Sequence, residues 1–559
     1  MFMQLYIELS SRHQQRESTA ALELELDVRK QAMAFFSLQL QDLLVLFLML
    51  LVPLYYYLVF FMSSKTNESP RFPTDWPLVG MLPSLVLNLH RFHDYATTVL
   101  ATAGGSFEAR GPPGLRFLLT CDPANARHIF VSSFGNYPKG AEFASFFDVM
   151  GDSFFNADGE SWRRQRARVQ HIMSGSRLLG FMAGWCRDKV ETGLLPLLSH
   201  MVDNNAPFDL QDVFTRFSFD MTAMPVFGLD TDRLSADMPP MHVPDAMDAV
   251  MEVGFFRHTV PVSCWRLMRR LRIGPERKLA AAQRVLRRFV AEMLETRKKK
   301  GSISDSCREV PALDDIASNY VNDPEYVDES GEPREFLHAT LINYMFAGRD
   351  TVGTTLTWLL YNLVKHPHTA DAIRAELAPI VTARKSKSKA ATDTTMVVFE
   401  PEETKPLVYL HAALFESMRL YPPGPIERKE ALTDDVLPSG HRVRAGDKIL
   451  ISLYAMARMD SVWGKDCAEY RPERWVTADG GALRCVPAHR FLPFNAGPRS
   501  CLGKDISVAQ MKCVVAAVVW NFDFELLQGH AVEPKLSVVL QMKNGLLVKA
   551  KKRHVAGSE

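Results

Sequence analysis

The stretch from Phe494 to Gly503 has residue types and spacing suited to chemistry at a metal. It contains a phenylalanine, two glycines, an arginine and a cysteine in the pattern FxxGxRxCxG. A thiolate ligand needs positive charge and hydrogen-bond donors around its sulfur. Apolar residues at helical spacing follow over 502–520, so Cys501 is expected at a helix N-terminus, where free backbone N–H groups favour negative charge. Cys501 is therefore predicted to bind the iron of a haem.

The other residues of this stretch have supporting roles. Gly497 and Gly503 are expected to let the backbone turn tightly and approach a flat macrocycle, and Arg499 is expected to reach a haem propionate. The alternative is that Cys501 is a small buried hydrophobe, which is our interpretation of the other cysteines. The joint spacing of Phe494, the glycines, Arg499 and Cys501 favours the haem loop.

A second pattern lies inside a long apolar segment, 336–365, which is predicted to be one helix. Gly348 costs about 1 kcal/mol relative to alanine in a helix interior, so it is expected to leave room for dioxygen above the haem. Asp350 and Thr351 are an acid beside an alcohol, which together can order water for proton delivery. The alternative is that Asp350 faces solvent or caps a turn.

Two further patterns place partners on one helix face. Trp162 and Arg166 are four residues apart, and Glu416 and Arg419 are three apart; Arg474 lies further on. Each pattern alone is weak. A tryptophan and an arginine on an amphipathic helix are commonly packing and surface charge, and an ExxR pair is commonly an exposed ion pair worth under about 1 kcal/mol.

Taken in order, these patterns resemble the signatures of the cytochrome P-450 family, and the resemblance extends from Pro73 to the C-terminus. It implies a haem b cofactor, with Cys501 as the axial ligand and Phe494 and Gly348 beside it. It also implies the family's acid–alcohol pair at Asp350 and Thr351. The remaining implied roles are a propionate each for Trp162 and Arg166, and a buried structural network of Glu416, Arg419 and Arg474 behind the haem loop.

Finer features resemble the plant hydroxylases of fatty acids and alkanes, nearest the mid-chain alkane hydroxylase subfamily. They include the strings AGRDT, LPSGHRV, SLYAMARMDSVWG, FNAGPRSCLGKD and QMK. The resemblance implies a monooxygenase that takes NADPH electrons from NADPH-cytochrome P-450 reductase and hydroxylates a hydrophobic small molecule, a long-chain fatty acid or alkane. Apolar residues expected to line its pocket are Phe143, Phe146, Phe147, Val352, Thr355 and Leu356; ordinary core is the alternative for each.

Three alternatives remain beside this interpretation. Members of the same subfamily also couple phenols in alkaloid synthesis. A hydroperoxide isomerase would work without a reductase, but such relatives typically lose the acid–alcohol pair that Asp350 and Thr351 supply. A haem-binding membrane protein without turnover would leave these two residues and the ExxR pair without a joint purpose.

Some of the implied contacts depend on single residues. Arg163, Arg164, Arg168 and Lys504 are proposed to form a basic patch that docks the acidic reductase. Lys429 stands where many relatives have a propionate-binding arginine, with Arg428 next to it, so that contact is left open.

Composition allows a large core and excludes some classes of function. The chain has 559 residues, 47% of them hydrophobic, and a net charge of +1, so nothing marks a nucleic-acid surface. Eight cysteines without paired CxxC spacing argue against a disulfide framework or a zinc site.

Four segments are expected. Residues 1–42 are an N-terminal extension, and Met33 is considered as an alternative start. Residues 43–62 carry no charge and would span about 30 Å as a helix, which predicts a transmembrane anchor. Residues 63–83 are a proline-rich linker, and residues 84–555 form the haem-thiolate domain. The family resemblance implies a single-pass protein of the endoplasmic reticulum membrane with this domain in the cytosol.

The haem-thiolate domain is predicted to be mostly α, an α+β fold with small sheets. Strand-like stretches are short, at 117–120, 448–453 and 545–548, while helical periodicity dominates. The polar segments 301–334 and 384–395 are predicted to be surface loops.

Overall fold

The computed structural model describes residues 51, 73, 75–76, 79–111, 116–304, 315–321, 323–328, 334–387 and 396–553. The chain divides into two units, Met1–Pro83 and Ser84–Glu559. The predicted extension 1–42, nearly all of the predicted anchor 43–62 and most of the linker 63–83 lie outside the described residues. In the part that is described, no helix is both long enough and apolar enough to cross a bilayer.

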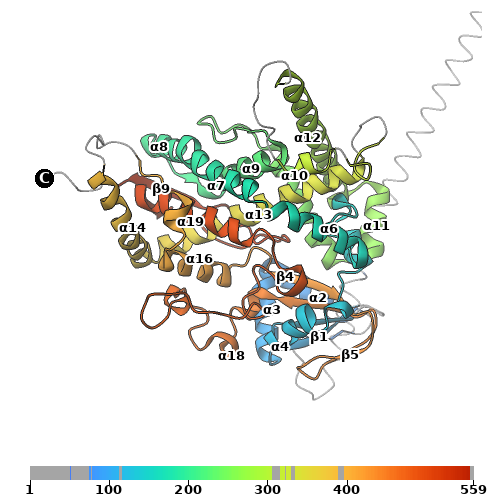
Figure 1. Ribbon diagram of the computed structural model, residues 1–559. Helices are drawn as coiled ribbons and strands as arrows, with labels where there is room; N and C mark the ends of the chain where they lie inside the picture. Colours follow the sequence, from blue (N-terminus) through green and yellow to red (C-terminus); the bar gives the residue numbers. More distant parts are fainter. Residues whose placement is uncertain are drawn as a thin grey trace, which may run out of the picture. The chain divides into compact units, whose positions relative to one another are not determined.

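The second unit is mostly helical, as predicted (Figure 1). Its helices, together with α2 at the boundary, are α2 (Leu82–Leu87), α3 (Phe92–Thr102), α4 (Pro123–Arg127), α5 (Ala141–Phe146), α6 (Gly159–Met173), α7 (Ser176–Lys189), α8 (Leu195–Asp203), α9 (Leu210–Phe227), α10 (His242–Thr259), α11 (Val262–Leu271), α12 (Gly274–Ser304), α13 (Glu335–Lys365), α14 (Pro367–Lys387), α15 (Pro401–Thr404), α16 (Val408–Leu420), α17 (Leu453–Met456), α18 (Asp460–Trp463) and α19 (Lys504–Asn521). Short 3₁₀ or π turns that matter below are η2 (His128–Ser132), η6 (Ala317–Asn319) and η8 (Gly497–Arg499).

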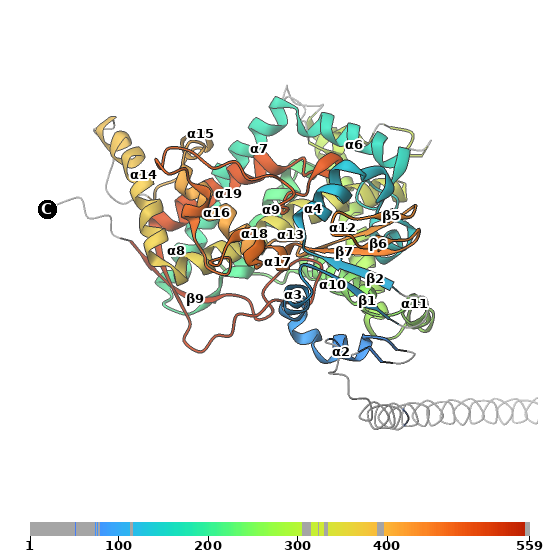
Figure 2. The same cartoon turned by 90° about the horizontal axis from the view of Figure 1, so that it is seen from below.

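Three small sheets accompany the helices. The largest has the order β1-β2-β7-β4, and Figure 2 shows β1, β2 and β7 side by side. Strand β2 runs parallel to β7, with Phe117 opposite Lys448, and the outer pairs are antiparallel. The strands of this sheet are β1 (Ser106–Arg110), β2 (Arg116–Thr120), β4 (Ile426–Glu430) and β7 (Lys448–Ser452). The others are β3-β9-β8 and β5-β6, from β3 (Phe208–Asp209), β5 (Asp435–Val436), β6 (Arg442–Val443), β8 (Phe522–Leu526) and β9 (Leu547–Lys552).

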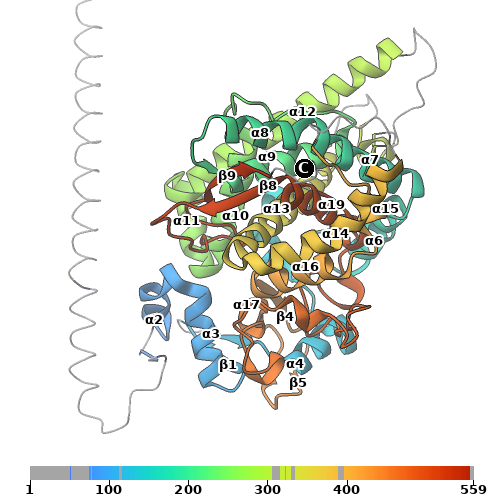
Figure 3. The same cartoon turned by 90° about the vertical axis from the view of Figure 1, so that its left-hand side faces the viewer.

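Helix α13 is the centre of the helical core. It packs against α9, α16 and α19 (Figure 3). Its sequence is apolar on nearly every face, and a helix of that kind is stable only when neighbours surround it. The apolar run 502–520 likewise becomes a buried helix, α19. Both predicted helices are therefore confirmed, with ends within two residues of those expected.

The segment 301–334 is only in part the surface loop that was predicted. Between its undescribed parts it forms η6, and Ile316, Tyr320 and Tyr326 are buried in a hydrophobic cluster. The backbone N–H of Ile316 donates to the carbonyl of Pro225 at 2.8 Å. Three apolar side chains spread through a polar segment have no regular period, which is why the sequence did not predict their burial.

Candidate active site

The Cys501 loop is held by a short backbone hydrogen bond and by one obligatory glycine. The N–H of Cys501 donates to the carbonyl of Phe494 at 2.8 Å. Gly497 has φ +65°, and a Cβ atom there would lie 2.0 Å from the carbonyl oxygen of Phe130 in η2. No other residue fits both the backbone conformation and this close approach. Gly497 therefore fixes the loop against the protein backbone.

Cys501 lies two residues before the N-cap of α19, as the sequence predicted. Burial raises the pKa of its thiol, while the backbone N–H of Gly503 and the guanidinium of Arg166 act to lower it. The residue is nevertheless accessible on its surface. A thiol in that position becomes a thiolate when a metal binds it.

Arg166, Trp162 and Arg499 converge beside this loop. Nη2 of Arg166 donates to the carbonyl of Ser500 at 2.5 Å. The Arg499 guanidinium lies 4.5 Å from the Trp162 ring centroid, and its Nη2 donates to Asp158 at 2.6 Å. The structure thus brings together the three residues predicted to hold propionates. In both Arg166 and Arg499, Nη2 already donates a hydrogen bond to a protein oxygen.

Two buried cationic side chains nearby have hydrogen-bond donors without a partner among the described residues. Nζ of Lys429 and Nε of Arg499 are buried and have no hydrogen-bond partner among the described residues. Burial lowers the pKa of Lys429 to about 8 and that of Lys139 to about 7. Nζ of Lys139 donates to the carbonyl of Phe155 at 2.8 Å. Sequence reasoning missed Lys139, because a lysine in a loop matches no motif; Lys429 was left open.

An accessible stripe lies on α13. Ala347 and Thr351 are one turn apart and exposed, although the helix is otherwise mostly buried. The hydroxyl of Thr351 donates to the carbonyl of Ala347 at 2.7 Å. Since α13 packs against α19, this accessible stripe and the accessible Cys501 belong to elements that are neighbours in the core.

These features fit a haem. Cys501 is a free, accessible cysteine that could supply a thiolate ligand, and the unpartnered donors of Lys429 and Arg499 could bind two carboxylates. The donor set is chemically right for an iron porphyrin with two propionates.

Asp350 does not share the stripe with Thr351. It is buried, and its Oδ1 accepts a hydrogen bond from Nη1 of Arg349 at 2.6 Å, while its Oδ2 has no partner among the residues described. Burial raises the pKa of Asp350 to about 6, although Arg349 acts to lower it. The acid and the alcohol are adjacent in sequence and are not hydrogen-bonded to each other, so any proton passing between them would need water.

Gly348 is held to glycine by a contact that the sequence did not predict. A Cβ atom there would lie 2.6 Å from Oγ1 and 2.7 Å from Cγ2 of Thr222 on α9. The expectation that Gly348 also leaves room for dioxygen stays a prediction. The space is needed for the close approach of α9 and α13, where Gly353 meets Ser218 in the same way.

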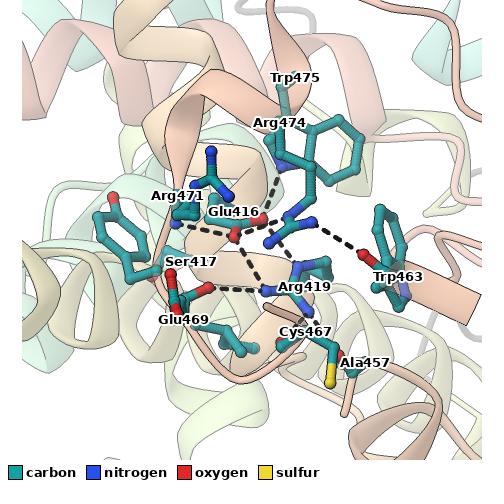
Figure 4. Close-up of polar contacts among 12 residues, drawn as sticks. Glu416, Ser417, Arg419, Ala457, Trp463, Cys467, Glu469, Arg471, Arg474 and Trp475 are labelled. Carbon is teal, nitrogen blue, oxygen red and sulfur yellow. Dashed lines mark hydrogen bonds and ion pairs between the residues drawn. The ribbon is translucent and has the colours of Figure 1, made fainter. Parts of the chain in front are cut away.

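Glu416 is fully buried and is the centre of a polar network (Figure 4). Arg419 donates to both of its carboxylate oxygens, at 2.8 and 2.9 Å, and Nε of Arg474 donates at 3.2 Å. The structure thus brings together the three residues that the sequence singled out. Trp475 and the backbone N–H of Arg471 complete the shell, each at 2.9 Å. These two were missed, because neither belongs to a helical spacing pattern.

The predicted basic patch is smaller than expected. Arg168 is not available for docking, because its guanidinium pairs with Asp323 and covers the Tyr320 ring at 4.5 Å. Arg164 and Lys504 are exposed, and Arg163 pairs with Glu160 on the surface.

The six candidate pocket residues do not form one group. Phe143, Phe146 and Phe147 lie in one hydrophobic cluster and pack around His258 of α10. Leu356 is fully buried in a different cluster, and the Thr355 hydroxyl donates to the carbonyl of Thr351. The expectation that the six line one pocket is therefore wrong for Leu356, which is core.

Comparison with known proteins agrees with this geometry. Residues 70–552 match the family model Cytochrome P450. Noroxomaritidine synthase 2 of Narcissus pseudonarcissus is 38% identical over 88% of this chain and 94% of its own length. Alkane hydroxylase MAH1 of Arabidopsis thaliana is 37% identical over 91% of this chain and 98% of its own length. Cytochrome P450 86B1 of the same plant is 37% identical over 86% of each chain.

Proposed function

Because the chain belongs to the cytochrome P450 family of haem-dependent monooxygenases, we propose that it hydroxylates a long-chain aliphatic substrate, a fatty acid or an alkane. The observation that carries the site assignment is the accessible Cys501, with the unpaired donors of Lys429 and Arg499 beside it. When bound, haem supplies an iron that activates dioxygen.

The residues of this chain have separate tasks in that reaction. Cys501 would hold the iron through its sulfur, and the N–H of Gly503 and the guanidinium of Arg166 would stabilise the negative charge on that sulfur. Lys429 and Arg499 would hold the carboxylates of the cofactor. The Trp162 ring packs against the guanidinium of Arg499 and orients it.

Protons are supplied from α13. Asp350 can carry a proton near neutral pH, since its pKa is raised to about 6, and Thr351 presents a hydroxyl on the accessible stripe. Water between the two would pass the proton on, because no direct hydrogen bond joins them.

We propose Phe143, Phe146 and Phe147, which are buried together in one hydrophobic cluster, as the side chains nearest an aliphatic substrate. Each methylene that leaves water contributes about 0.8 kcal/mol, so a long chain binds well in an apolar space without polar anchors. The likeness to alkane hydroxylase MAH1 supports the same class.

The setting we propose is the endoplasmic reticulum membrane. The uncharged run 43–62 would be the anchor, the domain would face the cytosol, and NADPH-cytochrome P450 reductase would supply electrons. A bilayer would also be the reservoir from which an aliphatic substrate enters.

A second candidate is the coupling of a phenolic or alkaloid substrate. It is favoured by the likeness to noroxomaritidine synthase 2, which is 38% identical to this chain, whereas alkane hydroxylase MAH1 is 37% identical. A reductase-independent hydroperoxide isomerase is the third, and the presence of Asp350 and Thr351 disfavours it.

Two measurements test the proposal. The carbon monoxide difference spectrum of the reduced protein should show the band of a thiolate-bound haem near 450 nm; a band near 420 nm would contradict the ligand. Turnover with reductase, NADPH and a panel of long-chain alkanes, fatty acids and phenolic amines should give hydroxylated aliphatic products. Products from the phenolic amines alone would favour the second candidate.

A further inference from the structure

Arg349, next to the predicted proton donor, is shared between two carboxylates. It is fully buried, and the same nitrogen, Nη1, donates to Asp350 at 2.6 Å and to Asp248 at 2.5 Å. Its Nε has no partner among the described residues, and neither has Oδ2 of Asp350. The single positive charge of Arg349 is therefore divided between α13 and α10.

Asp248 connects this buried pair to the surface. Its side chain is 25% exposed, whereas that of Asp350 is 2% exposed. Nε2 of Gln541 donates to Asp248 at 3.1 Å, and Nζ of Lys535 lies 3.8 Å from its other oxygen. Lys535 also pairs with Glu252 on α10 at 2.6 Å. Side chains from α13, α10 and the segment before the C-terminus thus form one charged chain from the interior outward.

The pKa values of the two carboxylates are shifted in opposite directions by this arrangement. Burial raises the pKa of Asp350 to about 6; Arg349 acts against the rise and Asp248 adds to it. Burial also acts to raise the pKa of Asp248, but Arg349 and Lys535 outweigh it and hold that pKa below its ordinary value. Asp248 thus stays ionised while Asp350 takes up and gives off a proton.

The charged groups that act on Asp350 are Arg349 on α13, Asp248 on α10 and Lys535 in the C-terminal segment. Further titratable groups act on the neighbours of this set: Asp212 on α9 and His242 on α10 act on Asp245, as do Asp248 and Arg349, and Lys278 on α12 acts on Glu252, as does Lys535. At the contact of α13 with α9, the side chains that meet Gly348 and Gly353 are Thr222 and Ser218, which do not titrate in this range.

We propose that Asp248 is a positioning residue for proton delivery: by competing for Arg349 it keeps Asp350 able to hold a proton at neutral pH. This inference rests on the proposed function, in which Asp350 supplies protons during dioxygen activation. The contact through which Asp248 would act is its hydrogen bond from Arg349.

The test is Asp248→Asn in the full-length holoenzyme. Asparagine keeps the hydrogen bond from Arg349 and removes the competing charge, so the pKa of Asp350 should fall by about one unit. The infrared carbonyl band of protonated Asp350, identified by its loss in Asp350→Asn, should titrate near pH 6 in the wild type and lower in the variant. The fraction of NADPH that yields peroxide instead of product should rise with pH around the same midpoints.

Two further variants give the opposite sign and a control. Lys535→Gln removes a positive charge that lowers the pKa of Asp350, so the infrared titration midpoint of Asp350 should move to higher pH. This variant also keeps the test decisive if Asp248→Asn does not fold, as judged by its carbon monoxide spectrum. Asp237→Asn removes an exposed carboxylate before α10 and should leave the midpoint unchanged.

The inference and the proposed function fail in different ways. An infrared midpoint that is the same in the wild type and in the folded variants would overturn the role of Asp248, whatever the activity. A shifted infrared midpoint with no change in the pH dependence of peroxide release would instead show that Asp350 is not the proton donor, which overturns the proposal as stated. Shifts of both quantities in the expected directions support it.

Discussion

At the scale of single residues, the site depends on one sulfur and on the groups that stabilise its charge. We expect Cys501→Ser to abolish the band near 450 nm in the carbon monoxide difference spectrum and to reduce NADPH-dependent product formation by at least about 100-fold. A serine oxygen does not donate the electron density that a thiolate gives to haem iron. The measurement is the spectrum together with turnover at equal haem content.

The control for this variant is Cys264→Ser, which changes an exposed cysteine of α11, far along the chain from the haem loop. It should keep both spectrum and turnover. A normal 450 nm band in Cys501→Ser would show that another residue binds the iron.

Lys429 is the clearest case of a buried donor without a partner. We expect Lys429→Gln to speed the loss of haem to an acceptor such as apomyoglobin by about 10-fold, because a charged contact to a carboxylate is worth about 1.5–3 kcal/mol. The measurement is the rate of haem transfer. Lys549→Gln, on the exposed edge of β9, is the matched control and should leave the rate unchanged. Equal rates in all three proteins would remove Lys429 from the cofactor site.

At the scale of elements, the crossing of α9 and α13 sets the position of the acid–alcohol pair. We expect Gly348→Ala to lower the free energy of unfolding by about 1–3 kcal/mol, because its Cβ would overlap Oγ1 and Cγ2 of Thr222. The double variant with Thr222→Ala removes both of these overlapping atoms and should recover most of the loss. The measurement is denaturant unfolding of the holoenzyme.

Gly180 offers a control for helix propensity. It lies in α7 with no atom within 4 Å of an added Cβ, so Gly180→Ala should be neutral or stabilise by up to about 1 kcal/mol. If Gly348→Ala changed the free energy of unfolding no more than Gly180→Ala does, α9 and α13 would not be packed as closely as Thr222 and Gly348 indicate.

The network around Glu416 holds the segment behind the haem loop. We expect Glu416→Gln to cost about 3–5 kcal/mol, since Arg419 and Arg474 would keep buried charges without their shared carboxylate. The variant should accumulate with little bound haem, which the ratio of haem absorbance to protein absorbance would report. Glu473→Gln, in the same short turn as Arg474 but hydrogen-bonded to Tyr409 at the surface, should be mild. Full haem content in Glu416→Gln would contradict an assembly role.

The elements that could be predicted are those with a strong local signal. Helices α13 and α19 follow from long apolar periodic runs, and the β2 and β7 strands from short β-branched or aromatic runs. The burial of Tyr320 and the partner of Gly348 could not be predicted, because both depend on contacts between segments far apart in the chain. Lys139 and Asp248 were missed for the same reason.

At the scale of the whole molecule, charge is almost balanced, at +1, so a partner that carries negative charge must recognise a local patch. Arg164 on α6 and Lys504 at the start of α19 are exposed, and α6 reaches the Cys501 loop through Arg166, which donates to Ser500. These two are what is left of the predicted patch once Arg168 is paired internally.

We expect Arg164→Glu to lower reductase-supported turnover several-fold at low salt, with the difference shrinking as salt approaches about 0.5 M, since screening weakens long-range attraction. The measurement is turnover against reductase concentration at several ionic strengths. Arg270→Glu reverses the same charge on the exposed face of α11, away from the Cys501 loop in the sequence, and should have little effect. Two equal losses, or a loss in Arg164→Glu that salt does not change, would mean that charge at this surface does not guide the reductase, and that electron entry uses another face of the domain.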